Sequence, residues 1–130
     1  MTYDELKTHI DTLLKSRRDV KLPNSDAEII PLVEESMLNI ANRYKVLKLL
    51  TQSENFKVLR ALGDGWYIKN PKTPKVGDKL DMDSELCMAV ANFTAASLSA
   101  NEHNRNIWNK KARRMVKDYA FKIYKTEPKG

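Results

Sequence analysis

The chain has 130 residues, 42% hydrophobic and 31% charged, which suits a single domain over residues 1–130 with a modest core. One cysteine excludes an internal disulfide framework, and no secretion signal or membrane-length apolar run is visible, so we expect a chain kept in a reducing cytoplasm or in a particle assembled there, with no membrane partner. The net charge of +6 lies entirely in residues 101–130, which hold nine basic and three acidic residues, and such asymmetry points to nucleic acid or an acidic partner surface.

The first predicted element is a helix over residues 1–18. Thr2 or Asp4 can cap its start, and the basic residues at its end suit the negative end of the helix dipole. Apolar residues follow at spacings of three and four, which is the period of one helix face. They are Leu6, Ile10, Leu13 and Leu14.

A long second helix is predicted over residues 25–52. Ser25 and Glu28 have the spacing of a capping box. Pro31 falls more than one turn inside, where it removes a backbone hydrogen bond, so we expect a kink there or a start closer to Pro31. The apolar stripe comprises Ile29, Ile30, Val33, Met37, Ile40, Ala41, Tyr44, Leu47 and Leu50.

A β-hairpin is predicted over residues 56–69, followed by a loop over residues 70–80. The Gly-Asp-Gly sequence at 63–65 permits a tight turn between flanks rich in aromatic and β-branched residues. The loop cannot be regular because each of its two prolines forces extended backbone before it. This unit could be an arm that contacts a neighbouring subunit, or a hairpin folded over its own core. The candidate contact residues are Trp66, Tyr67, Pro71 and Pro74.

The centre of the fold is predicted to be a helix over residues 83–100. Residues 86–100 contain no charged side chain, and an acidic segment, residues 81–85, stands just before them. A segment without charged residues that follows an acidic N-terminal segment is typical of a helix that is buried on most sides. Cys87 lies in this run, which favours a buried thiol over a reactive one.

A basic helix is predicted over residues 105–125. One face is apolar and carries Trp108, Ala112, Met115, Val116, Tyr119 and Ile123. Lysine and arginine on the opposite face can follow phosphates, and an aromatic residue at its end can stack or fill a partner's pocket; the alternative is a solvated helix face. The candidate nucleic-acid or partner surface comprises Lys110, Arg113, Arg114, Lys117, Phe121 and Tyr124.

The predicted fold is therefore mainly α, a small bundle of about four helices with an inserted β-hairpin and a proline-containing loop. The sequence has no zinc-spaced cysteine–histidine cluster, no phosphate-binding glycine loop and no nucleophile elbow. We expect no catalytic residues, no metal ligands and no cofactor, and an enzyme of unknown class is the weakest of three hypotheses.

Two segments carry a resemblance to a known family. They are residues 65–74 (Gly-Trp-Tyr-Ile-Lys-Asn-Pro-Lys-Thr-Pro) and residues 80–86 (Leu-Asp-Met-Asp-Ser-Glu-Leu), followed by an alanine-rich helix and a basic last helix. This order is similar to that of the head-to-tail connector, or adaptor, proteins of tailed bacteriophages. The resemblance covers roughly residues 25–125, and its motifs are patterns of residue type rather than invariant signatures.

The resemblance implies a structural virion protein at the head–tail interface, assembled in the cytoplasm of the bacterial host. Its subunits would form a homo-oligomeric ring, commonly dodecameric, that joins the portal protein to the tail or neck proteins and extends the DNA channel. Sequence-independent contact with packaged double-stranded DNA is possible in such a ring. The alternative is a small cytoplasmic nucleic-acid-binding protein that uses the basic last helix.

Overall fold

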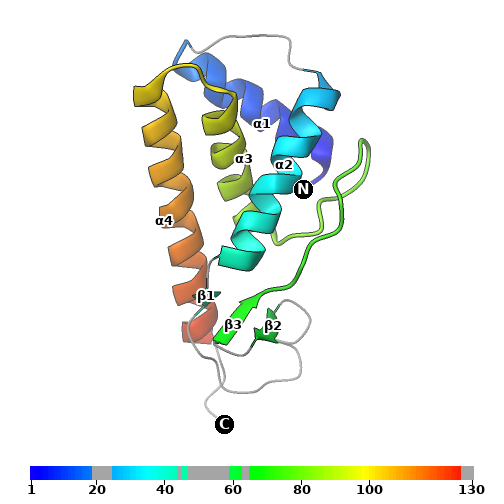
Figure 1. The fold of residues 1–130 in the computed structure, drawn as a ribbon, viewed down its shortest axis with the longest axis vertical. Helices are drawn as coiled ribbons and strands as arrows, with labels where there is room; N and C mark the ends of the chain where they lie inside the picture. The colour runs from blue at the N-terminus through cyan, green and yellow to red at the C-terminus, as the bar shows by residue number, and fades with distance from the viewer. Residues whose placement is uncertain (19–24, 44, 47–58, 63–64, 127–130) are drawn as a thin grey trace.

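The computed structural model describes residues 1–18, 25–43, 45–46, 59–62 and 65–126. This part of the chain holds four helices and three short strands (Figure 1), and the prediction of a mainly helical fold with four helices is confirmed. In chain order the elements are α1 (Tyr3–Ser16), α2 (Asp26–Arg43), β1 (Lys45–Val46), β2 (Leu59–Leu62), β3 (Gly65–Ile68), α3 (Ser84–Leu98) and α4 (Glu102–Thr126).

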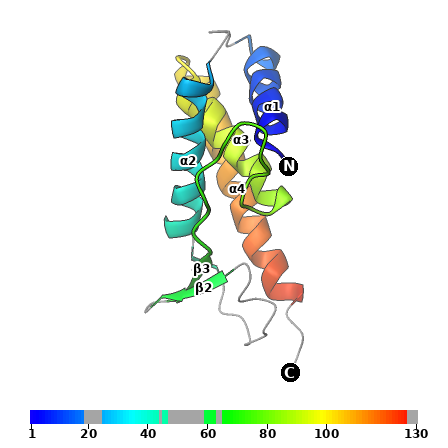
Figure 2. The same ribbon diagram turned by 90° about the vertical axis from the view of Figure 1, so that its right-hand side faces the viewer.

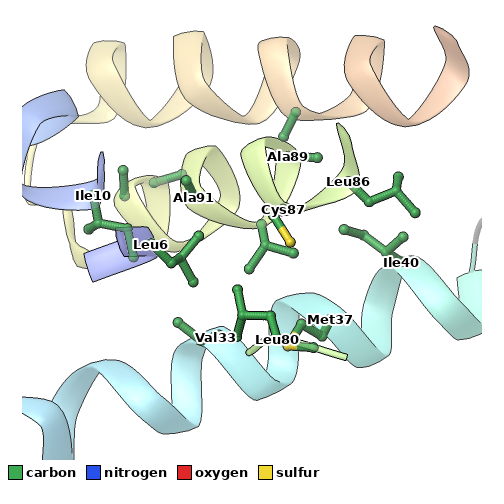
Figure 3. Packing of buried hydrophobic residues seen from close by; sticks show 14 of the residues in the cluster. Leu6, Ile10, Val33, Met37, Ile40, Leu80, Leu86, Cys87, Ala89 and Ala91 are labelled. Carbon is green, nitrogen blue, oxygen red and sulfur yellow. The ribbon is translucent and has the colours of Figure 1, made fainter. Parts of the chain in front are cut away.

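Helix α3 is the centre of the bundle, and α1, α2 and α4 all contact it. Its alanines make this possible because a methyl group lets a neighbouring helix approach closely from more than one side. Ala89, Ala91 and Ala95 are fully buried. Figure 3 shows larger side chains from α1 and α2 converging on this helix. They include Leu6, Ile10, Val33, Met37 and Ile40.

Helix α1 begins with a complete capping box. Thr2 Oγ1 accepts a hydrogen bond from the Glu5 backbone N–H, and the Glu5 carboxylate accepts one from the Thr2 backbone N–H. This reciprocal pair satisfies two of the backbone donors that a helix start otherwise leaves unpaired. At the other end, Arg17 Nε donates to Asn104 Oδ1 at 2.8 Å, which ties the end of α1 to the start of α4.

Helix α2 starts at Asp26 with Pro31 inside it, and it ends at Arg43. The prediction that this helix continues to residue 52 is corrected at Lys45–Val46, which form β1 and pair with β3. Backbone pairing with a distant strand replaces the helical continuation that the local apolar spacing favours. The predicted stripe residues Tyr44, Leu47 and Leu50 lie outside the described residues.

The three strands form an antiparallel sheet in the order β1–β3–β2. It lies at one end of the helical bundle, beside the last turns of α4 (Figures 1 and 2). β2 pairs with β3 from Leu59–Ile68 to Leu62–Gly65. The turn of the predicted hairpin, residues 63–64, lies outside the described residues, so the hairpin as a closed unit stays a prediction.

After β3 the chain returns along the bundle and is held against the N-terminus (Figure 1). The Tyr3 N–H donates to Asp78 O and the Leu80 N–H donates to Met1 O, both at 2.9 Å. Gly77 turns this segment with φ of +84°, a conformation that glycine adopts without a Cβ clash, and its N–H donates to Asp4 Oδ2. The proline-containing loop is thus fixed to the start of α1.

Candidate partner surface on the last helix

Helix α4 has a buried face and a charged face. The buried apolar side chains are Trp108, Ala112, Val116 and Tyr119, which pack on the side of α4 that faces α3. The predicted basic residues on the opposite side are all exposed: Lys110, Arg113, Arg114 and Lys117. The side chains of Phe121 and Tyr124 lie outside the described residues, so their place on this surface stays a prediction.

One part-buried hydrogen bond joins α4 to the start of α3. The Tyr119 hydroxyl donates to Asp83 Oδ2 at the start of α3. Burial raises the pKa of Tyr119, and the hydrogen bond to Asp83 raises it further. Asp83 occupies the N-cap position of α3, yet its side chain makes no cap hydrogen bond. This carboxylate at the start of α3 instead accepts the hydrogen bond from α4.

A shallow hollow of about 250 Å³ lies on the outer side of α4. Half-buried Ile107 lies among three basic side chains, Lys110, Lys111 and Arg114. The hollow therefore combines an apolar contact with three positive charges, an arrangement suited to an acidic surface that also carries an apolar side chain. Lys111 and Ile107 were not among the residues predicted for this surface. Each lies three residues from a predicted member, Lys111 from Arg114 and Ile107 from Lys110, and this helical spacing was the available signal.

A second concave surface lies where α2 and α4 pack on different sides of α3. It has a volume of about 230 Å³ and is mostly polar. Glu35 and Arg43 line it from α2, Phe93 from α3, and Arg113 from α4. Arg113 therefore faces this groove and not the hollow around Ile107, so the predicted basic surface divides into two sites.

Charge is distributed unequally between the two outer helices. Helix α4 contains eight lysine and arginine residues and two acidic residues, whereas α2 contains one arginine and four acidic residues. The four acids of α2 are Asp26, Glu28, Glu34 and Glu35. Asp26 is already engaged, because Lys7 Nζ and the Tyr3 hydroxyl both donate to its Oδ1 at 2.9 Å, which lowers its pKa.

The residues predicted to contact a neighbouring subunit lie in different environments. Tyr67 and Pro74 are buried within the chain, and Pro71 is half-buried. For Tyr67 and Pro74, burial matches the alternative interpretation of a segment folded over its own core. The side chain of Trp66 lies outside the described residues.

Within the described ranges, no group of three or more histidine, cysteine, aspartate or glutamate side chains is arranged to hold a metal ion. Cys87 is buried, which raises the pKa of its thiol and disfavours the nucleophilic thiolate. None of the helices that the structure describes is both long and apolar enough to cross a membrane. Comparison of the chain with protein-family models, with curated proteins and with solved structures finds no match.

Proposed function

We propose that this chain is a structural virion protein, a head-to-tail connector subunit of a tailed bacteriophage. In this proposal the subunits form a ring between the portal protein and the tail or neck proteins, and the ring extends the DNA channel. The protein is a scaffold and not an enzyme, and it is assembled in the host cytoplasm and retained in the virion.

The observation that carries the proposal is the division of the molecule into a helical body and a small sheet at one end (Figure 2). A ring subunit needs a rigid body with two lateral faces and an element that reaches a neighbour. The bundle around α3 supplies the body, and the oppositely charged helices α2 and α4 supply the faces. The predicted hairpin over residues 56–69, with Trp66 beside its turn, is the element that we assign to the arm.

The test is assembly with a portal protein encoded beside this gene. Native mass spectrometry of the purified chain mixed with that portal should give one complex with a fixed number of subunits. A portal from an unrelated phage is the control and should give none. A chain that stays monomeric and has no affinity for its neighbouring portal would contradict the proposal, as would a host metabolic operon around the gene.

A second function, sequence-independent nucleic-acid binding, is favoured by the exposed basic residues of α4. It requires affinity for DNA or RNA that falls steeply with salt, because binding releases counterions from the phosphates. Replacing Lys110, Arg113, Arg114 and Lys117 together by alanine should weaken that binding and flatten its salt dependence. Unchanged binding in this variant, measured by fluorescence anisotropy, would remove the basis of this function.

A further inference from the structure

We infer that the acidic outer strip of α2 in one copy binds the basic outer strip of α4 in the next copy. The inference rests on the proposed function, because it names the surfaces through which ring subunits meet. The occupant of the hollow on α4 is then a second copy of this chain.

The acidic strip runs along the exposed side of α2, and its member Glu35 also lines the groove to which Arg113 of the same chain contributes. The members of the strip are exposed and recur at the spacing of one helix face: Glu28, Pro31, Glu35 and Leu38. Leu38 is 37% exposed, and in the described part of the chain only Val76 is another large apolar side chain with comparable exposure. Half-buried Glu34 stands beside the strip. An exposed leucine one helical turn after two carboxylates is suited to burial against a surface that combines basic and apolar side chains.

The basic strip on α4 has the complementary chemistry. Lys110, Arg114 and Lys117 are exposed, and half-buried Ile107 forms the apolar part of the hollow between them and Lys111. The aliphatic stems of lysine and arginine can pack on Leu38 and Pro31 while their charged ends reach the glutamates. The two strips therefore carry opposite charge, and each also presents apolar surface.

The geometry of the two helices fits such a contact. α2 and α4 lie on different sides of α3 and run in the same direction (Figure 1). Rotation between neighbours in a large ring changes helix direction little, so α2 of one copy meets α4 of the next nearly parallel. The intervals 28–31–35–38 and 107–110–114–117 are the same, so two parallel strips of about 15 Å can lie along one another, with Glu35 beside Arg114 and Pro31 beside the aliphatic stem of Lys110.

Because the two surfaces differ, the contact is head-to-tail and leaves one free strip at each end of a chain of subunits. This property allows a strict test by charge reversal. The first variant, Glu34→Lys with Glu35→Lys, makes the α2 strip basic. The second, Lys110→Glu with Arg114→Glu and Lys117→Glu, makes the α4 strip acidic. Both leave the capping residue Glu28 and the core untouched.

Self-association is measured by sedimentation velocity up to millimolar concentration at low salt, with circular dichroism to establish folding. The wild type should form concentration-dependent oligomers, and each variant alone should associate about tenfold or more weakly because like charges oppose each other. The mixture of both variants should recover association, since each intact strip finds an intact partner and each reversed strip a reversed one. Lys72→Glu with Lys75→Glu, two exposed loop lysines, is the matched control and should behave as wild type.

A wild type that stays monomeric throughout, or a mixture that does not recover association, would overturn the inference. So would α4 reversal that abolishes DNA binding while leaving self-association intact. Portal binding separates this contact from the proposed function. If the mixed variants do not recover self-association but still form a portal-bound ring, only the contact is refuted. If they recover self-association but the chain does not bind the portal, the contact is supported and the connector function is refuted.

Discussion

The hydrogen bond between Tyr119 and Asp83 offers a sharp test of how α4 is held. Tyr119→Phe keeps the buried ring and removes only the hydroxyl that donates to Asp83 Oδ2. Asp83 is exposed, so water can replace the lost donor and the carboxylate keeps a hydrogen-bond partner. The expected cost is therefore about 1.5 kcal/mol of unfolding free energy, at the lower end for hydrogen bonds to charged groups.

A double-mutant cycle measures this interaction directly. Tyr119→Phe, Asp83→Asn and the double variant are compared by urea denaturation, and the coupling energy between the two positions should be about 1 kcal/mol. Asp118→Asn, which removes an exposed acid one residue from Tyr119, is the matched control and should show no coupling with Tyr119→Phe. A coupling energy near zero for Asp83 would refute the reasoning.

The same pair predicts how stability responds to alkali. Burial and then the Asp83 hydrogen bond raise the pKa of Tyr119 above its ordinary value of 10.0. Above pH 10 the unfolded chain loses the tyrosine proton while the folded chain keeps it, so stability falls as pH rises, by about 1.4 kcal/mol per pH unit for each such group. Tyr119→Phe should lose less stability between pH 10 and 11 than the wild type, and an identical pH profile would count against a raised pKa.

Three further changes test other parts of the fold. Ala95→Leu at the centre of α3 should lower the free energy of unfolding, measured by urea denaturation, by about 1–3 kcal/mol through overpacking, whereas Ala27→Leu on the exposed side of α2 should change it little. Equal stabilities of the two variants would show that α3 is not at the centre of the core. Asp26→Asn should reduce the loss of stability on acidification, because the lowered pKa of Asp26 contributes stability that disappears as pH falls below about 4; unchanged acid melting curves would contradict this. Gly77→Ala should cost about 1 kcal/mol because of its positive φ, although nothing lies within 4 Å of the added Cβ, and a stabilised variant would show that the turn is not strained.

The parts of the fold that could be predicted are those encoded locally. The charge-free run of residues 86–100 identifies α3, because burial on several sides requires the loss of charge over successive turns. The buried face of α4 follows from its helical spacing, and Trp108 and Val116 are buried as that spacing indicates. Exposure of Lys110 and Arg114 follows from the same spacing.

The parts that could not be predicted depend on residues far apart in the chain. The end of α2 is one, because β1 pairs with β3 through backbone groups that carry no sequence-specific signal. The second is the hydrogen-bond partner of Asp83. Its bond with Tyr119 forms only once α3 and α4 have packed together, and no local pattern in the sequence indicates it. The burial of Pro74 is a third, because it depends on the loop that returns to the N-terminus.

The bridge between Thr2 and Lys79 has a consequence for the order in which the molecule assembles. α3 and α4 are joined by a turn of three residues, whereas α1 reaches α3 only after the chain between residues 2 and 79 has closed. Closing the longer loop costs about 3 kcal/mol more in chain entropy, so the α3–α4 pair should form early and α1 should dock late. Pulse-labelling hydrogen exchange during refolding should therefore find the amides of α4 protected before those of α1. The N-terminal segment is then the last part of the fold to dock.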